Sequence, residues 1–165
     1  MATPFRSALA VRHSIPMPDE PTFDDVEASY AAALAAVAAP VAQRLRDALA
    51  QVEAATSMGG WVEPPRAPGA AASQPTPQLS TEAEALLAVV NDLGADIPFD
   101  WPHWSEGRFL AESAENLRDA SGAQAVMLIN TLQRFDRFSD GALLGAFNTG
   151  VIQAAVRRIV DALPA

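Results

Sequence analysis

The sequence predicts an all-α protein: a compact C-terminal domain of about five helices, an alanine-rich N-terminal helical hairpin and a Pro/Ala-rich connecting loop. Three observations lead to this prediction. Apolar side chains recur three and four residues apart through most of the chain, which is the spacing of one helix face. No segment shows the strict alternation of a half-buried strand. Five prolines fall within residues 63–78 and separate two helical regions.

Residues 22–58 are expected to form the two N-terminal helices. The first begins near Thr22 or Asp24, because the acidic side chains that follow interact favourably with the helix dipole. Its apolar stripe consists of Tyr30, Leu34 and Val37. The second runs from Pro40, which suits a first helical turn, to about Thr56, and is ended by Gly59 and Gly60. The two stripes suit an antiparallel hairpin or a partner's groove.

Proline-rich segments lie on both sides of these helices. Residues 1–21 contain four prolines and no sustained periodicity, which predicts a flexible or extended arm. Residues 59–79 are predicted to form a loop or linker, because residues 63–78 lack the side chains to bury themselves. The chain therefore divides into an arm, a helical hairpin at 22–58, this linker and a helical domain at 80–165.

The C-terminal domain has clear helix-start and helix-stop signals. Thr81 and Glu84 have the spacing of a capping box, and Gly94 suits a left-handed stop. Asp100 is placed to cap a helix that has Trp101 and Pro102 in its first turn and extends to about Leu117. Three more helices follow: one opened by Ser121 and Gly122, a short one capped by Ser139, and a last one over residues 151–163.

Charge and composition exclude several function classes. The formal net charge is −9, and every basic residue apart from histidine is arginine. This balance argues against non-specific nucleic-acid binding and against anionic membrane surfaces. Without cysteine the chain has no thiolate metal site, and its two histidines lie far apart, so no metal site and no cofactor are expected. No secretory signal or membrane span is recognised, which predicts a cytoplasmic protein.

Three blocks of sequence resemble a family of small uncharacterised bacterial proteins. The first block is Ile97-Pro98-Phe99-Asp100-Trp101-Pro102-x-Trp104, the second lies within residues 134–143, and the third lies within residues 150–159. The resemblance is strongest over Ser80–Leu163 and implies a compact helical fold without implying a reaction. Members of that family tend to have Glu and His where this chain has Asp140 and Ala142, so any chemistry of that histidine is lost here.

Asp100 and His103 are the candidate catalytic residues. They lie three apart in a first helical turn, where the carboxylate can orient the imidazole for general-base catalysis. Glu106 and Asp140 join them if the first two blocks pack together. A structural interpretation is favoured, because an aspartate before a Trp-Pro helix start is first of all an N-cap.

Trp101, Trp104, Arg137 and Asp140 are the candidate binding residues. The two tryptophans line an aromatic pocket or, as favoured, anchor the helix from below. Arg137 and Asp140 have the spacing of a hydrogen-bonded brace between the last helices, which is favoured over an arginine that holds an anionic ligand.

These observations favour a non-catalytic protein–protein interaction or accessory module, whose partner is another protein or a second copy. The first alternative is a small enzyme that uses Asp100 and His103, with Arg137 as an anion clamp. The second is an acidic regulator that neutralises a basic protein. The sequence does not define a small-molecule ligand.

Overall fold

The computed structural model describes residues 21–65, 69 and 74–164, so the predicted arm at residues 1–21 lies outside the described residues except for Pro21. The described part contains seven α-helices and one two-stranded sheet, and 64% of the described residues are helical, which confirms the all-α prediction. The helices are α1 (Phe23–Ala35), α2 (Ala39–Ala54), α3 (Thr81–Asn91), α4 (Ser105–Glu112), α5 (Gly122–Asp136), α6 (Ala142–Asn148) and α7 (Val151–Ala162). Two short 3-10 helices, η1 (Trp101–His103) and η2 (Glu115–Leu117), flank α4.

The N-terminal helices begin as predicted but are arranged differently. Thr22 caps α1 through a capping box with Asp25, whose carboxylate accepts the backbone N–H of Thr22 at 3.0 Å. Pro40 lies in the first turn of α2. The two helices meet at 100° rather than running antiparallel, because they pack against different helices: α1 against α5, and α2 against α3 and α7.

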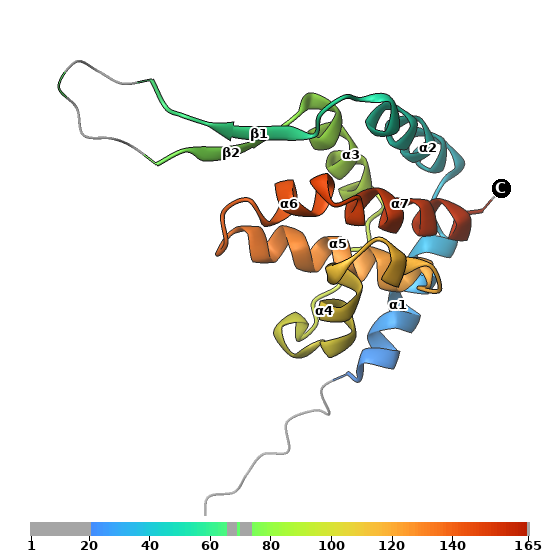
Figure 1. Ribbon diagram of the computed structural model, residues 1–165. Coiled ribbons are helices and arrows are strands. Elements are labelled where there is room, and N and C mark those ends of the chain that lie inside the picture. Colours follow the sequence, from blue (N-terminus) through green and yellow to red (C-terminus); the bar gives the residue numbers. More distant parts are fainter. Residues whose placement is uncertain (1–20, 66–68, 70–73, 165) are drawn as a thin grey trace, which may run out of the picture.

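The predicted loop at 59–79 contains a β-hairpin that the sequence analysis missed. Strand β1 (Gly59–Val62) pairs antiparallel with β2 (Thr76–Leu79), with Gly59 opposite Leu79 and Val62 opposite Thr76. Gly59 and Gly60 therefore belong to a strand and do not end α2, which stops at Ala54. Figure 1 shows this hairpin projecting from the helical body. Residues 66–68 and 70–73 of the same segment lie outside the described residues.

Two of the predicted helix caps in the C-terminal part are wrong. Ser80, not Thr81, caps α3, and its hydroxyl accepts the N–H of Ala83 at 3.2 Å. The cap of α6 is Gly141 in a left-handed conformation rather than Ser139, and a carboxylate oxygen of Asp136 accepts the N–H of Leu143 at 2.9 Å. Asp136, from the preceding helix, thus makes the hydrogen bond to the start of α6 that the sequence analysis expected of Ser139.

Other local predictions are confirmed. Gly94 follows α3 with φ +69°, the left-handed conformation expected of a helix stop. Ser121 caps α5 through a capping box, in which the Gln124 side chain accepts the backbone N–H of Ser121 at 2.9 Å. These signals act over three or four residues, which is why the sequence reveals them.

Helix α5 lies at the centre of the fold, beside α7 and in contact with α1, α4 and α6 (Figure 1). Most of its length is buried, as expected of a helix that is apolar on nearly all sides. Tyr30 and Leu34 of α1 and Leu45 of α2 belong to the same hydrophobic cluster as the C-terminal helices. The hydrophobic core contains residues from before and after the β-hairpin. The division of the chain into separate domains stays a prediction.

Candidate functional site

The first block begins at a buried hydrogen-bond network centred on Tyr30. The tyrosine hydroxyl donates to the carbonyl oxygen of Ile97 at 2.8 Å and accepts the N–H of the same residue at 3.2 Å. It also accepts from Nδ2 of Asn130 at 3.0 Å, and that nitrogen donates to the carbonyl of Ala95 at 2.7 Å. Burial raises the pKa of Tyr30 above its ordinary value. Helix α1 therefore holds the start of the first block against α5.

Aromatic rings continue from this network into the block. Phe99 meets Tyr30 edge to face at 6.1 Å and Trp104 edge to face at 5.7 Å between ring centroids. The guanidinium of Arg134, from the second block, lies 5.7 Å from the centre of the Phe99 ring and donates to Asp96 at 2.7 Å. Such ring and cation contacts favour one relative orientation of the groups involved. The first two blocks are thus joined through Phe99.

Trp104 anchors α4 to the core, as the favoured interpretation expected. Its side chain is 3% exposed, and Gly107 lets the helix approach it. A Cβ atom at Gly107 would overlap the Trp104 ring, with Cδ2 only 2.7 Å away. Trp101, three residues earlier, is only partly buried and faces a pocket.

An open pocket of about 570 Å³ lies between α4 and α5, and we call it the aromatic pocket. Its lining is almost entirely apolar and consists of Trp101, Pro102, Trp104, Gly107, Arg108, Ala111, Leu128, Thr131, Leu132, Phe135 and Phe138. Two lining residues from the second block project into solvent: Phe135 is 44% exposed and Phe138 is 80% exposed. The alternative that the tryptophans line an aromatic pocket therefore also agrees with the structure. Sequence analysis missed the contribution of the two phenylalanines.

Asp100 and His103 are close together, and Asp100 is the N-cap of the short 3-10 helix η1 that contains Trp101 and Pro102. Its carboxylate lies 2.7 Å from Nδ1 of His103, and its side chain makes no capping bond to the 3-10 helix that follows. The α-helix starts only at Ser105. Both side chains are open to solvent, His103 at 78% and Asp100 at 55%. Glu106 faces away and accepts from Gln124 at 3.1 Å. The pair thus lacks the enclosed surroundings that strengthen acid–base catalysis.

Arg137 and Asp140 do not form the predicted brace. Within the described part of the chain, neither side chain makes a hydrogen bond or an ion pair, and both are exposed. Arg137 lines a separate small hollow beside Asn130, whereas Asp100 lines another, so these residues do not combine into one anion-binding site. The neighbouring Arg134 does make an ion pair, with Asp96, and lies over the ring of Phe99.

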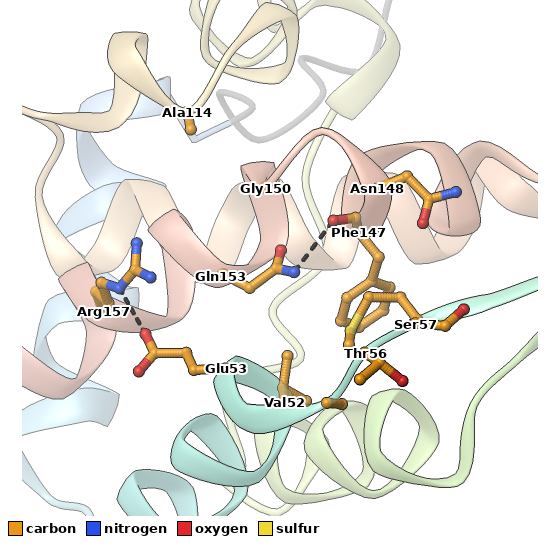
Figure 2. A pocket seen from close by; sticks show the side chains of 12 residues that line it. Val52, Glu53, Thr56, Ser57, Ala114, Phe147, Asn148, Gly150, Gln153 and Arg157 are labelled. Carbon is orange, nitrogen blue, oxygen red and sulfur yellow. Dashed lines mark hydrogen bonds and ion pairs between the residues drawn. The ribbon is translucent and has the colours of Figure 1, made fainter.

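A second pocket, of about 630 Å³, is polar and lies where α2 and the segment after it face α6 and α7. Figure 2 shows its main side chains, with Arg157 donating to Glu53 at 2.7 Å and Gln153 donating to the carbonyl of Phe147 at 3.1 Å. The Oε1 atom of Gln153 is buried and has no partner among the described residues. The sequence contained no signal for this pocket, because its residues come from three distant stretches of the chain, within residues 52–58, at 114 and within 147–157.

Among the described residues, no group of three or more His, Cys, Asp or Glu side chains is placed to hold a metal ion. No single described helix is long and apolar enough to cross a membrane; α1 and α2 reach that length and composition only as a bent pair.

Comparison with known proteins yields one match. A model of a family of unknown function, DUF6508, matches residues 37–164 and so covers α2 to α7, including both pockets. The match agrees with the resemblance to an uncharacterised family and reaches further towards the N-terminus than residue 80. Neither the curated proteins nor the solved structures contain a match to this chain.

Proposed function

We propose that this chain, which belongs to the family of unknown function DUF6508, is a non-catalytic protein-interaction module whose aromatic pocket receives bulky apolar side chains of a protein. The observation that carries the proposal is the meeting of the first two sequence blocks at an open apolar pocket with exposed phenylalanines on its rim. Clusters of exposed aromatic side chains mark interaction sites on otherwise polar surfaces.

The pocket has the composition of an interface centre. Aromatic side chains supply large contact areas with little loss of conformational entropy, and they dominate the energetic hot spots of interfaces. Arg108, the charged lining residue, donates to the carbonyl of Pro102 at 2.8 Å and forms no ion pair with a described carboxylate. Its guanidinium is therefore available to an acidic or carbonyl group beside an inserted apolar side chain.

The exposed Asp100–His103 pair makes catalysis the weaker alternative. Its imidazole is mostly solvated, and no described carboxylate, hydroxyl or amide other than Asp100 bonds to it. The acidic-regulator alternative rests on net charge alone, and the aromatic pocket has almost no acidic lining to attract a basic surface. Binding at the pocket is therefore expected to depend mainly on apolar contact.

Site-specific crosslinking tests this proposal. Because the chain has no cysteine, a single Arg108→Cys variant can be labelled with benzophenone maleimide at the pocket rim. The control is Phe109→Cys, the next residue of the same helix, which lines a different hollow. Each labelled chain is illuminated in extract of the native host, and the adducts are identified by mass spectrometry.

We expect discrete protein adducts from position 108, to another protein or to a second copy of this chain, and few from position 109. Equal crosslinking from positions 108 and 109, or no saturable protein adduct from position 108, contradicts the proposal.

A further inference from the structure

We infer that the aromatic pocket binds a second copy of this chain, through a two-fold symmetric contact in which Phe138 of each copy enters the pocket of the other. This inference rests on the proposed function and names the partner. A symmetric contact requires one patch to be complementary to itself, so that a projecting group and its receptor lie side by side. The end of α5 has this property, because Phe138 is 80% exposed and belongs to the rim of the pocket.

The apolar surface at this end of the molecule extends beyond the pocket. Six large apolar side chains of the described residues are exposed, and three of them lie at or against the turn between α5 and α6: Trp61, Phe135 and Phe138. Trp61 of strand β1 packs over Gly141 in that turn, with Cζ2 2.7 Å from the position of a Cβ atom there. The hairpin therefore adds apolar surface at the turn between α5 and α6.

Charges on either side of Phe138 complement each other across a two-fold axis. Arg137 precedes it and Asp140 follows two residues later, both exposed and both without a bonding partner among the described residues. In contrast, five other arginines, at positions 44, 118, 134, 157 and 158, lie in ion pairs with carboxylates. In a symmetric pair, Arg137 of each copy can meet Asp140 of the other, so a second copy supplies both missing partners.

Net charge opposes this association, and its effect is limited. Two chains of formal charge −9 repel one another. At physiological ionic strength, charges separated by more than about 8 Å are largely screened. The local contact between opposite charges and the buried aromatic rings then decides the outcome. We therefore expect a reversible dimer at 0.15 M salt rather than an obligate one.

The first test compares oligomeric state. Sedimentation velocity and light scattering of the full chain should give a concentration-dependent dimer. Phe138→Ser should raise the dimer dissociation constant about a hundredfold or more, because each dimer loses two buried rings. Phe109→Ser removes a phenylalanine that is 54% exposed outside the pocket and should leave the constant unchanged. A chain that stays monomeric to about 100 μM overturns the inference. So does a dimer that Phe138→Ser does not weaken.

A charge-reversal experiment then tests the predicted pairing. Arg137→Glu places two acids opposite each other at both symmetric contacts, and Asp140→Arg places two bases there. For each variant alone, the dimer dissociation constant should be at least about tenfold higher than for the wild type. An equimolar mixture should form heterodimers close to wild-type strength, because every contact then joins opposite charges. Failure of the mixture to associate overturns the pairing.

The two proposals fail differently. A monomeric chain whose position 108 still crosslinks saturably to another protein overturns self-association and keeps the interaction module. A chain that neither dimerises nor crosslinks overturns both. Circular dichroism of each variant confirms that the exposed substitutions leave the fold intact.

Discussion

Removing the hydroxyl group of Tyr30 should destabilise the whole fold. Tyr30→Phe keeps the ring and its edge-to-face contact with Phe99, and deletes only the oxygen. That oxygen joins α1 to the first block and to α5 through three hydrogen bonds, two to the backbone of Ile97 and one from Asn130. The substitution therefore isolates the network from the packing around it.

The magnitude follows from these three bonds. A typical intramolecular hydrogen bond contributes about 0.5–1.5 kcal/mol net, and a buried group left without a partner costs about 1–3 kcal/mol. Nδ2 of Asn130 keeps its bond to Ala95, and Ile97 is only partly buried, so water relieves part of the loss. We expect the free energy of unfolding to fall by about 2–3 kcal/mol. For a chain of this size, that lowers the melting temperature by roughly 5–10 °C.

Urea denaturation followed by tryptophan fluorescence measures this change, since Trp104 is buried beside the network. The midpoint should fall while the slope of the transition stays constant, as expected when only stability changes. Ser29→Ala is the control: it removes an exposed hydroxyl from the adjacent position of α1, where it donates to the carbonyl of Asp25 at 2.8 Å. A loss below about 0.5 kcal/mol for Tyr30→Phe, the range of ordinary surface substitutions, refutes the reasoning.

Three further predictions concern Tyr30 and the glycines. Tyr30 is the only tyrosine of the chain, so ultraviolet absorbance follows its ionisation alone. Burial raises the pKa of Tyr30 above its ordinary value of 10.0. The stability that the protonated hydroxyl contributes is therefore fully present below pH 10.0 and is lost as the pH rises through the higher pKa of the folded state. Titration of the folded protein at or below 10.0 contradicts this. Gly107→Ala should lower the free energy of unfolding by about 1–3 kcal/mol, because the new methyl group overlaps Trp104. Gly145→Ala adds a methyl group inside α6 that meets nothing within 4 Å, and it should raise the free energy of unfolding by about 0.5–1 kcal/mol. Thermal melts that show the same effect for Gly107→Ala and Gly145→Ala refute this difference. Gly141→Ala should lower the free energy of unfolding by about 1–2 kcal/mol, since φ is +87° and Trp61 lies close by, and a melt unchanged from the wild type opposes this expectation.

The proposed interaction site was only partly visible in the sequence. The first sequence block, residues 97–104, contains the predicted binding residues Trp101 and Trp104, and both line the pocket. The other wall comes from Phe135 and Phe138, more than thirty residues away, and no local pattern indicates that α4 and α5 lie side by side. The contact of Arg134 with Phe99 was likewise missed, because a helix sequence alone does not reveal which of its arginines faces a neighbouring ring.

The sequence by itself determined the all-α class, the helix starts at Thr22 and Ser121, the stop at Gly94 and the approach of Asp100 to His103. All of these depend on residues within about four positions of one another, where backbone geometry dictates the contact. Only the tertiary structure decided the pairing of β1 with β2, the bond from Tyr30 to Ile97 and the aromatic pocket. These join residues far apart in the chain, and their partners are selected by the packing of the whole core.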